Sequence, residues 1–328
     1  MMKQRLTPAR FRFAVQTVFT LFCIYVGFRF AAFIAWALGQ SDSMVAKPGA
    51  VEGFLPISAL LGFRQLLTTG QWDSVHPAGL SIFIAVMLMA FLFRKGFCGY
   101  VCPVGFISGI LERIGRKMQL AVIPNKWIDY PLTGVKYLLL GGFCYAVFSM
   151  DARSLEAFIT GPYNMVSDAK MLAFFTSPSA LSMMIIGVLA LLSIVIRNFW
   201  CRYLCPYGAL LGLLAWFGPT NVRRDADACI DCGKCTKQCP SGIRVHEKTL
   251  VRTPECIGCA ECVGACPVDG CLSFTAYGRK RIPWLAVGLG AVAVLLLVWA
   301  WAKSTGHWDS EMPLFMLKRI YGMFLSAA

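Results

Sequence analysis

Eight cysteines in the last third of the chain have spacings suited to binding iron–sulfur clusters. Two runs of the form C-x2-C-x2-C-x3-C-P begin at Cys229 and Cys256. Two-residue spacing lets a short loop place three thiolates around one [4Fe–4S] cube, and the cysteine before each proline supplies the fourth ligand of the other cube. The expected ligand sets are Cys229, Cys232, Cys235 and Cys266 for the first cluster, and Cys256, Cys259, Cys262 and Cys239 for the second.

This spacing is that of bacterial two-cluster ferredoxins. A structural zinc site normally uses two separated ligand pairs, so a triple run that occurs twice argues against zinc. Disulfides are disfavoured on the cytoplasmic side of a membrane, where thiols are kept reduced. We therefore expect a small ferredoxin-like domain with two [4Fe–4S] clusters over residues 219–281.

Four further cysteines belong to a duplicated motif, [FW]-C-x-Y-x-C-P-x-G, which we call CxxxCP. It begins at Phe97 and again at Trp200. Cysteines four residues apart share one face of a helix, and the proline that follows marks a break in the backbone. Two such half-sites could bring four thiols together for a third iron–sulfur cluster, for copper(I) or for a redox dithiol, and the residues leave these three open. The cysteines are Cys98, Cys102, Cys201 and Cys205.

The composition places these motifs in a membrane protein. Hydrophobic residues make up 57% of the 328-residue chain and charged residues only 15%, against about 25% charged in soluble proteins. A hydrocarbon core about 30 Å thick needs about 20 apolar residues in a helix. Five runs reach or approach that length, at 14–38, 77–93, 131–150, 178–196 and 283–302.

Lysine and arginine flank these runs unevenly, which predicts the orientation. Basic residues precede the first run, follow the second and fourth, and precede the fifth, whereas the segments 40–76 and 151–177 are poor in them. Cytoplasmic loops carry this excess, so we expect the N-terminus inside, the C-terminus outside and both CxxxCP motifs on the cytoplasmic side. The net charge of +14 reflects these flanks, and no run of five or six basic residues supports nucleic-acid binding.

The expected fold class is therefore an all-α polytopic membrane protein with about five transmembrane helices and an internal duplication, into which the ferredoxin-like domain is inserted. The predicted domains are residues 1–218, a four-helix membrane region with both CxxxCP motifs, residues 219–281, and residues 282–328, a fifth span with a short outer tail. No C-x-x-C-H motif occurs, no expected span holds a histidine pair for haem, and no P-loop or dinucleotide fingerprint is present. We expect an electron-transfer subunit rather than a stand-alone enzyme.

Three residues outside these motifs are further candidates for a role in function or in packing. Arg29 lies in the first expected span, where a charge is costly, and it either anchors a quinone head or an acidic partner or extends to the membrane surface. His76, directly before the second span, is expected to mark the start of a helix, with a contact to quinone or to a partner as the alternative. Cys271 is expected to be a buried neighbour of the clusters.

Together these motifs resemble the membrane polyferredoxins of the NapH/NosR type, which are associated with periplasmic nitrate reductase and nitrous-oxide reductase. The resemblance rests on both CxxxCP motifs, on the double ferredoxin signature, and on the segment from Val51 to Pro56 with His76 to Gly79. It implies electron transfer at the bacterial inner membrane, between the quinol pool or a cytoplasmic donor and a partner respiratory reductase or its maturation system.

The chain departs from the larger members of that family. It has no amino-terminal flavin-binding domain and no [ST]-G-A-T motif, so covalent flavin is not expected. A related branch reduces copper during oxidase assembly and carries an extra carboxy-terminal domain, whereas only about 26 residues follow the fifth span here. A copper reductase or assembly factor that uses the CxxxCP thiols is the alternative function.

Overall fold

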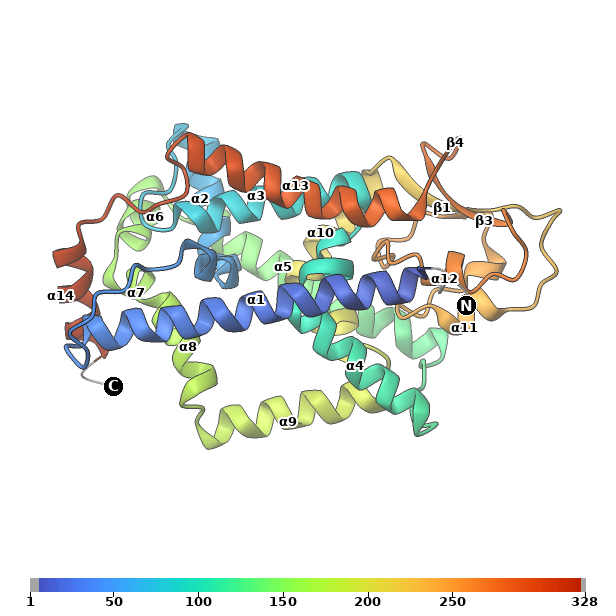
Figure 1. Ribbon diagram of the computed structural model, residues 1–328, viewed down its shortest axis with the longest axis horizontal. Coiled ribbons are helices and arrows are strands. Elements are labelled where there is room, and N and C mark those ends of the chain that lie inside the picture. Colours follow the sequence, from blue (N-terminus) through green and yellow to red (C-terminus); the bar gives the residue numbers. More distant parts are fainter. Residues whose placement is uncertain (1–5, 326–328) are drawn as a thin grey trace, which may run out of the picture. The chain divides into compact units, whose positions relative to one another are not determined.

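The computed structural model describes residues 6–325 and is mainly helical (Figure 1). The short η turns include η1 (Gly49–Phe54) and η4 (Val245–Glu247). The α-helices are α1 (Pro8–Ala37), α2 (Pro56–Thr69), α3 (Pro77–Phe93), α4 (Pro103–Lys117), α5 (Lys126–Ser149), α6 (Ala152–Ile159), α7 (Pro162–Met165), α8 (Ser167–Thr176), α9 (Ala180–Val195), α10 (Pro206–Phe217), α11 (Lys234–Gln238), α12 (Glu261–Gly264), α13 (Trp284–Ser304) and α14 (Leu314–Leu325).

The five apolar runs all form helices, namely α1, α3, α5, α9 and α13. Among the described residues, α1, α5 and α13 are long and apolar enough to cross a membrane. The pair α8 and α9 passes the same test only together, with a bend of 75° between them, and α3 is a shorter apolar helix of 17 residues. The chain is thus a membrane protein, and the predicted count of five crossings and their orientation stay predictions.

The chain divides into two compact units. The first unit contains the chain up to Thr20, Val86–Leu140 and Ile186–Leu295. It therefore holds every cysteine of the two ferredoxin runs and of the two CxxxCP motifs. The second unit contains Leu21–Ala85, Gly141–Ile185 and the chain from Leu296 onward.

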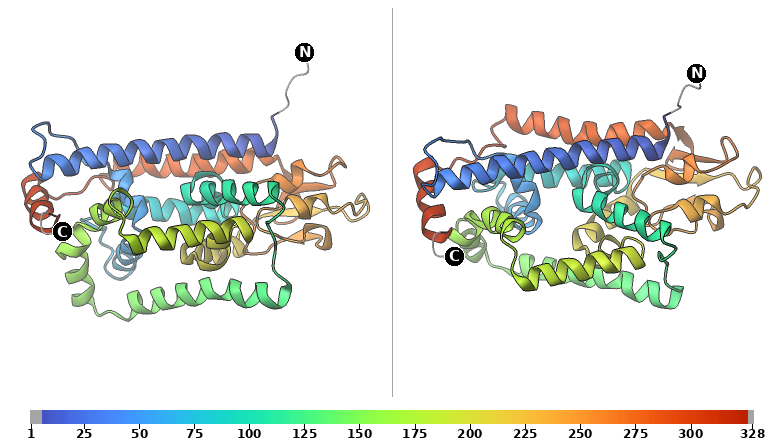
Figure 2. Two further views of the ribbon diagram at one scale, coloured as in Figure 1. Left: turned by 90° about the horizontal axis from the view of Figure 1, so that it is seen from below. Right: turned by 60° about the horizontal axis from the view of Figure 1, so that its bottom comes forward.

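Within the first unit, the start of α1 runs beside the start of α13 (Figure 2). Phe11, Val15 and Phe19 of α1 pack in one apolar cluster with Ala291 of α13 and Tyr100. This packing fixes the first turns of α1 next to the first CxxxCP motif.

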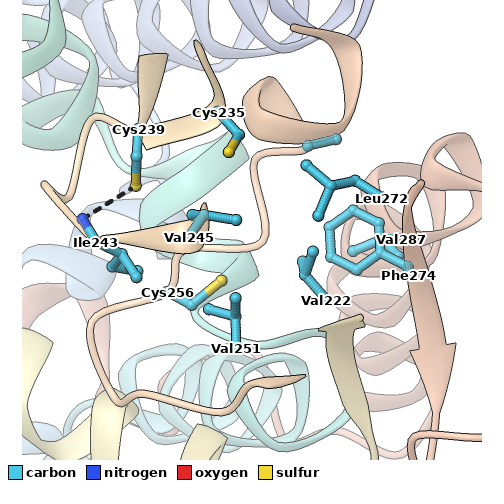
Figure 3. Close-up of a cluster of buried hydrophobic side chains, with 11 residues drawn as sticks. Val222, Cys235, Cys239, Ile243, Val245, Val251, Cys256, Leu272, Phe274 and Val287 are labelled. Carbon is cyan, nitrogen blue, oxygen red and sulfur yellow. Dashed lines mark hydrogen bonds between the residues drawn. The ribbon is translucent and has the colours of Figure 1, made fainter. Parts of the chain in front are cut away.

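The ferredoxin-like segment adds a small antiparallel sheet to the first unit. Strands β1 (Thr220–Arg224), β2 (Leu250–Val251), β3 (Leu272–Ala276) and β4 (Lys280–Ile282) lie in the order β2-β1-β3-β4. Val222 at the centre pairs with Phe274 and with Val251, and each of the three side chains is 1% exposed. Since these apolar residues face one side of the sheet, that side forms the wall of a core shared with the cysteine loops (Figure 3).

Candidate iron–sulfur centres

The first expected ligand set lines one cavity. Cys229, Cys232, Cys235 and Cys266 surround about 330 Å³ of space that is partly open to solvent. Cys232 is exposed, and the neighbouring Ile230 has 66% of its surface exposed. The cavity therefore lies at the surface of the ferredoxin-like segment.

The second expected set lines a different cavity, with about 360 Å³ of space that is likewise partly open to solvent. Its thiols come from Cys239, Cys256, Cys259 and Cys262. Cys239, Cys256 and Cys259 are all buried, at no more than 9% exposed. Figure 3 shows the sulfur atoms of Cys239 and Cys256 in the shared core, with the backbone N–H of Ile243 donating to the sulfur of Cys239 at 3.4 Å. Each cavity thus combines three thiols of one run with the pre-proline thiol of the other.

Left-handed backbone conformations give the two ligand loops the same shape. In the first loop Asp231 and Gly233, on either side of Cys232, have φ values of 48° and 67°. In the second loop Gly258 and Ala260, on either side of Cys259, have 65° and 61°. Such conformations are uncommon for residues other than glycine and persist only where the surroundings hold them. The matching turns let three closely spaced thiols line a single cavity in each loop.

The chemistry of these thiols fits an iron–sulfur cluster. Burial raises the pKa of Cys239 to about 11 and also raises the pKa of Cys259 and Cys262, so without a cation these thiols stay protonated. At Cys229, which is only partly buried, a backbone hydrogen bond with Asp231 and then the Arg224 side chain lower the pKa. Metal ligation requires thiolates, which bound iron would stabilise in the buried set.

No group of three or more histidine, cysteine or acidic side chains within residues 6–325 is arranged to hold a single metal ion. A [4Fe–4S] cube distributes its thiolate ligands over several irons, so its ligands surround a volume rather than a point.

The two CxxxCP motifs adopt the same local structure. Their first cysteines lie in one-turn π-helices, η2 (Phe97–Val101) and η3 (Trp200–Leu204). The wider turn is closed by hydrogen bonds from Cys102 N–H to the Phe97 carbonyl, at 2.9 Å, and from Cys205 N–H to the Trp200 carbonyl, at 3.0 Å. Single π turns are frequent at functional sites. The expected break follows directly, because α4 and α10 each begin at the proline of the motif.

The second cysteine of each motif caps the following helix. The sulfur of Cys102 accepts the backbone N–H of Gly105 at 3.5 Å, and the sulfur of Cys205 accepts that of Gly208 at 3.3 Å. A helix N-terminus carries partial positive charge and favours a thiolate. Both copies therefore place one thiol at the start of a helix, where backbone N–H groups offset part of the cost of burying a thiolate.

Several contacts bring the two copies together. The rings of Phe97 and Tyr207 meet edge to face with centroids 5.9 Å apart. The hydroxyl of Ser108 on α4 donates to Asn198, just before η3, at 2.9 Å, and α4 packs against both η2 and η3. The thiols of Cys98, Cys102, Cys201 and Cys205 lie within electrostatic range of one another.

A buried ion-pair network beside these cysteines was not predicted from the sequence. Lys136 Nζ lies 2.7 Å from both carboxylate oxygens of Glu255, and Lys95 Nζ lies 3.5 Å from one of them. Burial alone would raise the pKa of Glu255, but the two lysines outweigh it and lower the pKa to about 2. Lys136 falls inside an apolar run, and a charge there is the signal that could have revealed the network.

The three single residues have different surroundings. Arg29 is exposed on α1. His76 directly precedes α3 and is 1% exposed, with Nε2 at 2.8 Å from the carbonyl oxygen of Asn164 and Nδ1 at 3.4 Å from Glu52. Cys271 is 2% exposed and lines the first cavity.

Two protein-family models match the chain. The model described as a 4Fe-4S binding domain matches residues 75–120 and 176–224, which include both CxxxCP motifs. The model described as a 4Fe-4S dicluster domain matches residues 221–267. The chain thus contains iron–sulfur binding domains in both of its cysteine-rich regions.

Curated relatives have related names. YccM of Escherichia coli, named for electron transport, is 39% identical over 94% of this chain and 89% of its own length. The methylamine utilization ferredoxin-type protein MauN of Methylorubrum extorquens is 26% identical over 71% of this chain and 79% of its own. The ferredoxin-type protein NapH of Escherichia coli is 24% identical over 66% of this chain and 74% of its own. No solved structure matches the chain.

Proposed function

Because this chain belongs to the NapH-like family of ferredoxin-type membrane proteins, we propose that it is a membrane-bound electron-transfer subunit with two [4Fe–4S] clusters in its ferredoxin-like domain. The observation that supports this proposal most directly is the pair of cavities, each lined by three thiols of one run and the pre-proline thiol of the other. Bound clusters would supply one-electron transfer, and the protein supplies the thiolates, the burial and the positions. Electrons would pass between the quinol pool or a cytoplasmic donor and a partner reductase or its maturation system.

The CxxxCP cysteines would hold a third iron–sulfur centre. A 4Fe-4S binding model matches both motifs, and each motif places one thiol at the start of a helix. Cys98, Cys102, Cys201 and Cys205 come from two copies of one turn, so they offer four similar soft ligands. Copper at these thiols is the alternative, and it is an outcome of the experiment below.

The test is iron and acid-labile sulfide per chain in anaerobically purified protein, beside a variant in which all four CxxxCP cysteines are replaced by serine. We expect about ten to twelve irons in the natural protein and about eight in the variant, because two cubes remain. About eight in both would contradict the third centre, and stoichiometric, chelator-resistant copper(I) binding lost in the variant would then support copper handling. Fewer than about eight in the natural protein would contradict the two-cluster proposal.

The clusters are proposed to face the cytoplasm. The support is the excess of lysine and arginine around both CxxxCP motifs and the ferredoxin-like segment. A cysteine-free tag inserted at the exposed Tyr277 turn should be accessible to a membrane-impermeant label only in inverted membrane vesicles. Labelling in intact spheroplasts would contradict this orientation.

A further inference from the structure

The first CxxxCP motif touches the ligand loop of the second cavity. A Cβ atom added at Gly99 would lie 2.5 Å from the carbonyl oxygen of Ile257, so only glycine fits there without a shift. The hydroxyl of the next residue, Tyr100, donates to the carbonyl oxygen of Gly258 at 3.1 Å. Both partners lie between the ligands Cys256 and Cys259, so the two backbones meet at the second cavity.

The second CxxxCP motif touches the other side of the same cavity. Arg202, which occupies the position of Gly99 in the duplicate, donates to the carbonyl oxygen of Ser241 and pairs with Asp129 at 2.6 Å. Asn198 Nδ2 donates to the carbonyl oxygen of Pro240 at 2.8 Å. Pro240 and Ser241 directly follow Cys239, the fourth ligand of the second set. The two copies of the motif therefore contact the same site in different ways, with glycine against Ile257 in the first copy and arginine against Ser241 in the second.

Buried charges hold this junction in place. Arg12 Nε donates to the carbonyl oxygen of Gly99 at 3.0 Å, while its Nη1 lies 2.5 Å from Glu261. Glu261 begins α12 between two ligands of the second set, and both side chains of the pair are at most 5% exposed. On the other side, Glu255 next to Cys256 is paired with Lys95 and Lys136.

The first cavity has different neighbours. Cys232 and Ile230 are exposed. Within residues 6–325, the side-chain hydrogen bonds of its lining residues reach other parts of the ferredoxin-like segment, as from Arg224 to Lys248 and from Cys271 to Asp225. This cavity therefore faces solvent, whereas the second cavity contacts both CxxxCP motifs.

We propose that the second ferredoxin site is the sole electron-transfer neighbour of the CxxxCP site, and that the first ferredoxin site is the contact for a soluble one-electron redox protein. The inference rests on the proposed function. Each step moves one electron, so one centre is oxidised as its neighbour is reduced, and no bond forms or breaks. Electron transfer through protein slows steeply with distance, so a shift of the backbones at Gly99 should slow transfer between the two sites. Arg12 and Tyr100 are positioning residues for this junction.

The test compares Gly99→Ala with the matched control Gly134→Ala, whose added Cβ meets nothing within 4 Å. The purified protein is mixed anaerobically with a reduced soluble ferredoxin, and the three centres are followed by rapid-freeze EPR. In Gly99→Ala we expect unchanged iron content and unchanged reduction of both ferredoxin clusters, but a several-fold slower reduction of the CxxxCP centre. Equal rates in the two variants would overturn the proposal.

A second pair of variants covers the case in which Gly99→Ala fails to assemble. Cys232→Ser removes a ligand of the first site and Cys259→Ser one of the second. With dithionite as a small electron donor, the CxxxCP centre should still be reduced rapidly in Cys232→Ser and slowly in Cys259→Ser. The opposite order, or equal rates, would contradict the proposed sequence of sites. Absence of the third EPR signal in the natural protein would instead contradict the proposed function.

Discussion

Each residue of the ligand sets acquires its role from its neighbours along the chain and in space. Cys239 and Cys266 each precede a proline, and each lies in the cavity of the other run. Burial keeps Cys239 protonated in the absence of a cation, whereas Cys229 lies in a loop whose hydrogen bonds favour its thiolate. Thiols of one sequence motif therefore differ in their electrostatic surroundings.

The crossed ligand sets make a prediction about pairs of variants. Cys266→Ser should weaken the same EPR signal as Cys232→Ser, and Cys239→Ser the same signal as Cys259→Ser, with a loss of about four irons in each case. The reason is that each pre-proline thiol lines the cavity of the other run. If Cys266→Ser and Cys259→Ser affected the same signal, the crossed assignment would be wrong.

The buried pair of Arg12 and Glu261 predicts a large loss of stability on truncation. Arg12→Ala leaves the Glu261 carboxylate buried without its closest partner, which costs about 3–5 kcal/mol. The control is Arg244→Ala, because the pair of Arg244 with Glu247 is about half exposed and such surface pairs contribute about 0–1 kcal/mol. Thermal unfolding of the detergent-solubilised protein, followed by cluster absorbance, should show a clearly larger decrease in Tm for Arg12→Ala. Similar shifts would contradict this role.

Among the elements, the small sheet is the wall of the second cavity. Phe274 of β3 pairs with Val222, lines the second cavity with it, and is 1% exposed. The helices α11 and α12 each begin directly after a left-handed residue, Gly233 and Ala260, and each carries the third cysteine of its run. The sheet and the two short helices thus define the space in which the thiols meet.

Phe274→Ala should destabilise this region by about 3–5 kcal/mol, because it leaves a cavity in a packed core. Tyr277→Ala, at an 81% exposed position just beyond the same strand, is the control and should change stability little. In a urea titration, the signal of the second cluster should be lost at a lower urea concentration in Phe274→Ala than in the natural protein. An unchanged midpoint would contradict the assignment of Phe274 to the core.

At the scale of the whole molecule, segments far apart in the sequence meet in buried polar clusters. In the second unit, Lys47 pairs with Asp168 at 2.7 Å and with Glu52 at 3.2 Å, and Tyr321 donates to Asp168 at 2.6 Å. His76 faces Glu52 in the same cluster. Four separate stretches of the chain are therefore joined by buried ion pairs and hydrogen bonds.

His76 makes the stability of the second unit depend on pH. Burial lowers the pKa of His76, but Glu52 outweighs it and raises the pKa above its ordinary value of 6.5, with Asp168 acting in the same direction and Lys47 against it. The backbone N–H of His76 also donates to the buried Asp73 at 2.9 Å. Because the folded pKa is the higher one, this contribution is complete below about pH 6.5 and is lost as the pH rises through the folded pKa.

The measurement is Tm in detergent between about pH 5.5 and 9 for the natural protein and for His76→Gln. The natural protein should lose stability on the alkaline side of the folded pKa of His76, and the variant should have a flatter profile over that interval. Parallel profiles would contradict a charged His76 in the folded protein.

The sequence by itself predicted the cysteine chemistry, and it determined the positions of the apolar helices. Both follow from local rules, since two-residue spacing confines three thiols to one loop and apolar runs of 17 to 25 residues form helices in or beside a membrane. Proline after Cys102 and Cys205 predicted the breaks at which α4 and α10 begin. The number of crossings stayed open because α3 and α9 are short.

The tertiary structure alone decided which ferredoxin site meets the CxxxCP motifs. Gly99 and Ile257 are far apart in the sequence, as are Arg12 and Glu261, and no periodicity or spacing encodes such pairs. Lys136 pairs with Glu255 from an apolar helix, against its local preference for water. A buried charge is tolerated only beside its partner, so folding had to bring these distant segments together before the junction could exist.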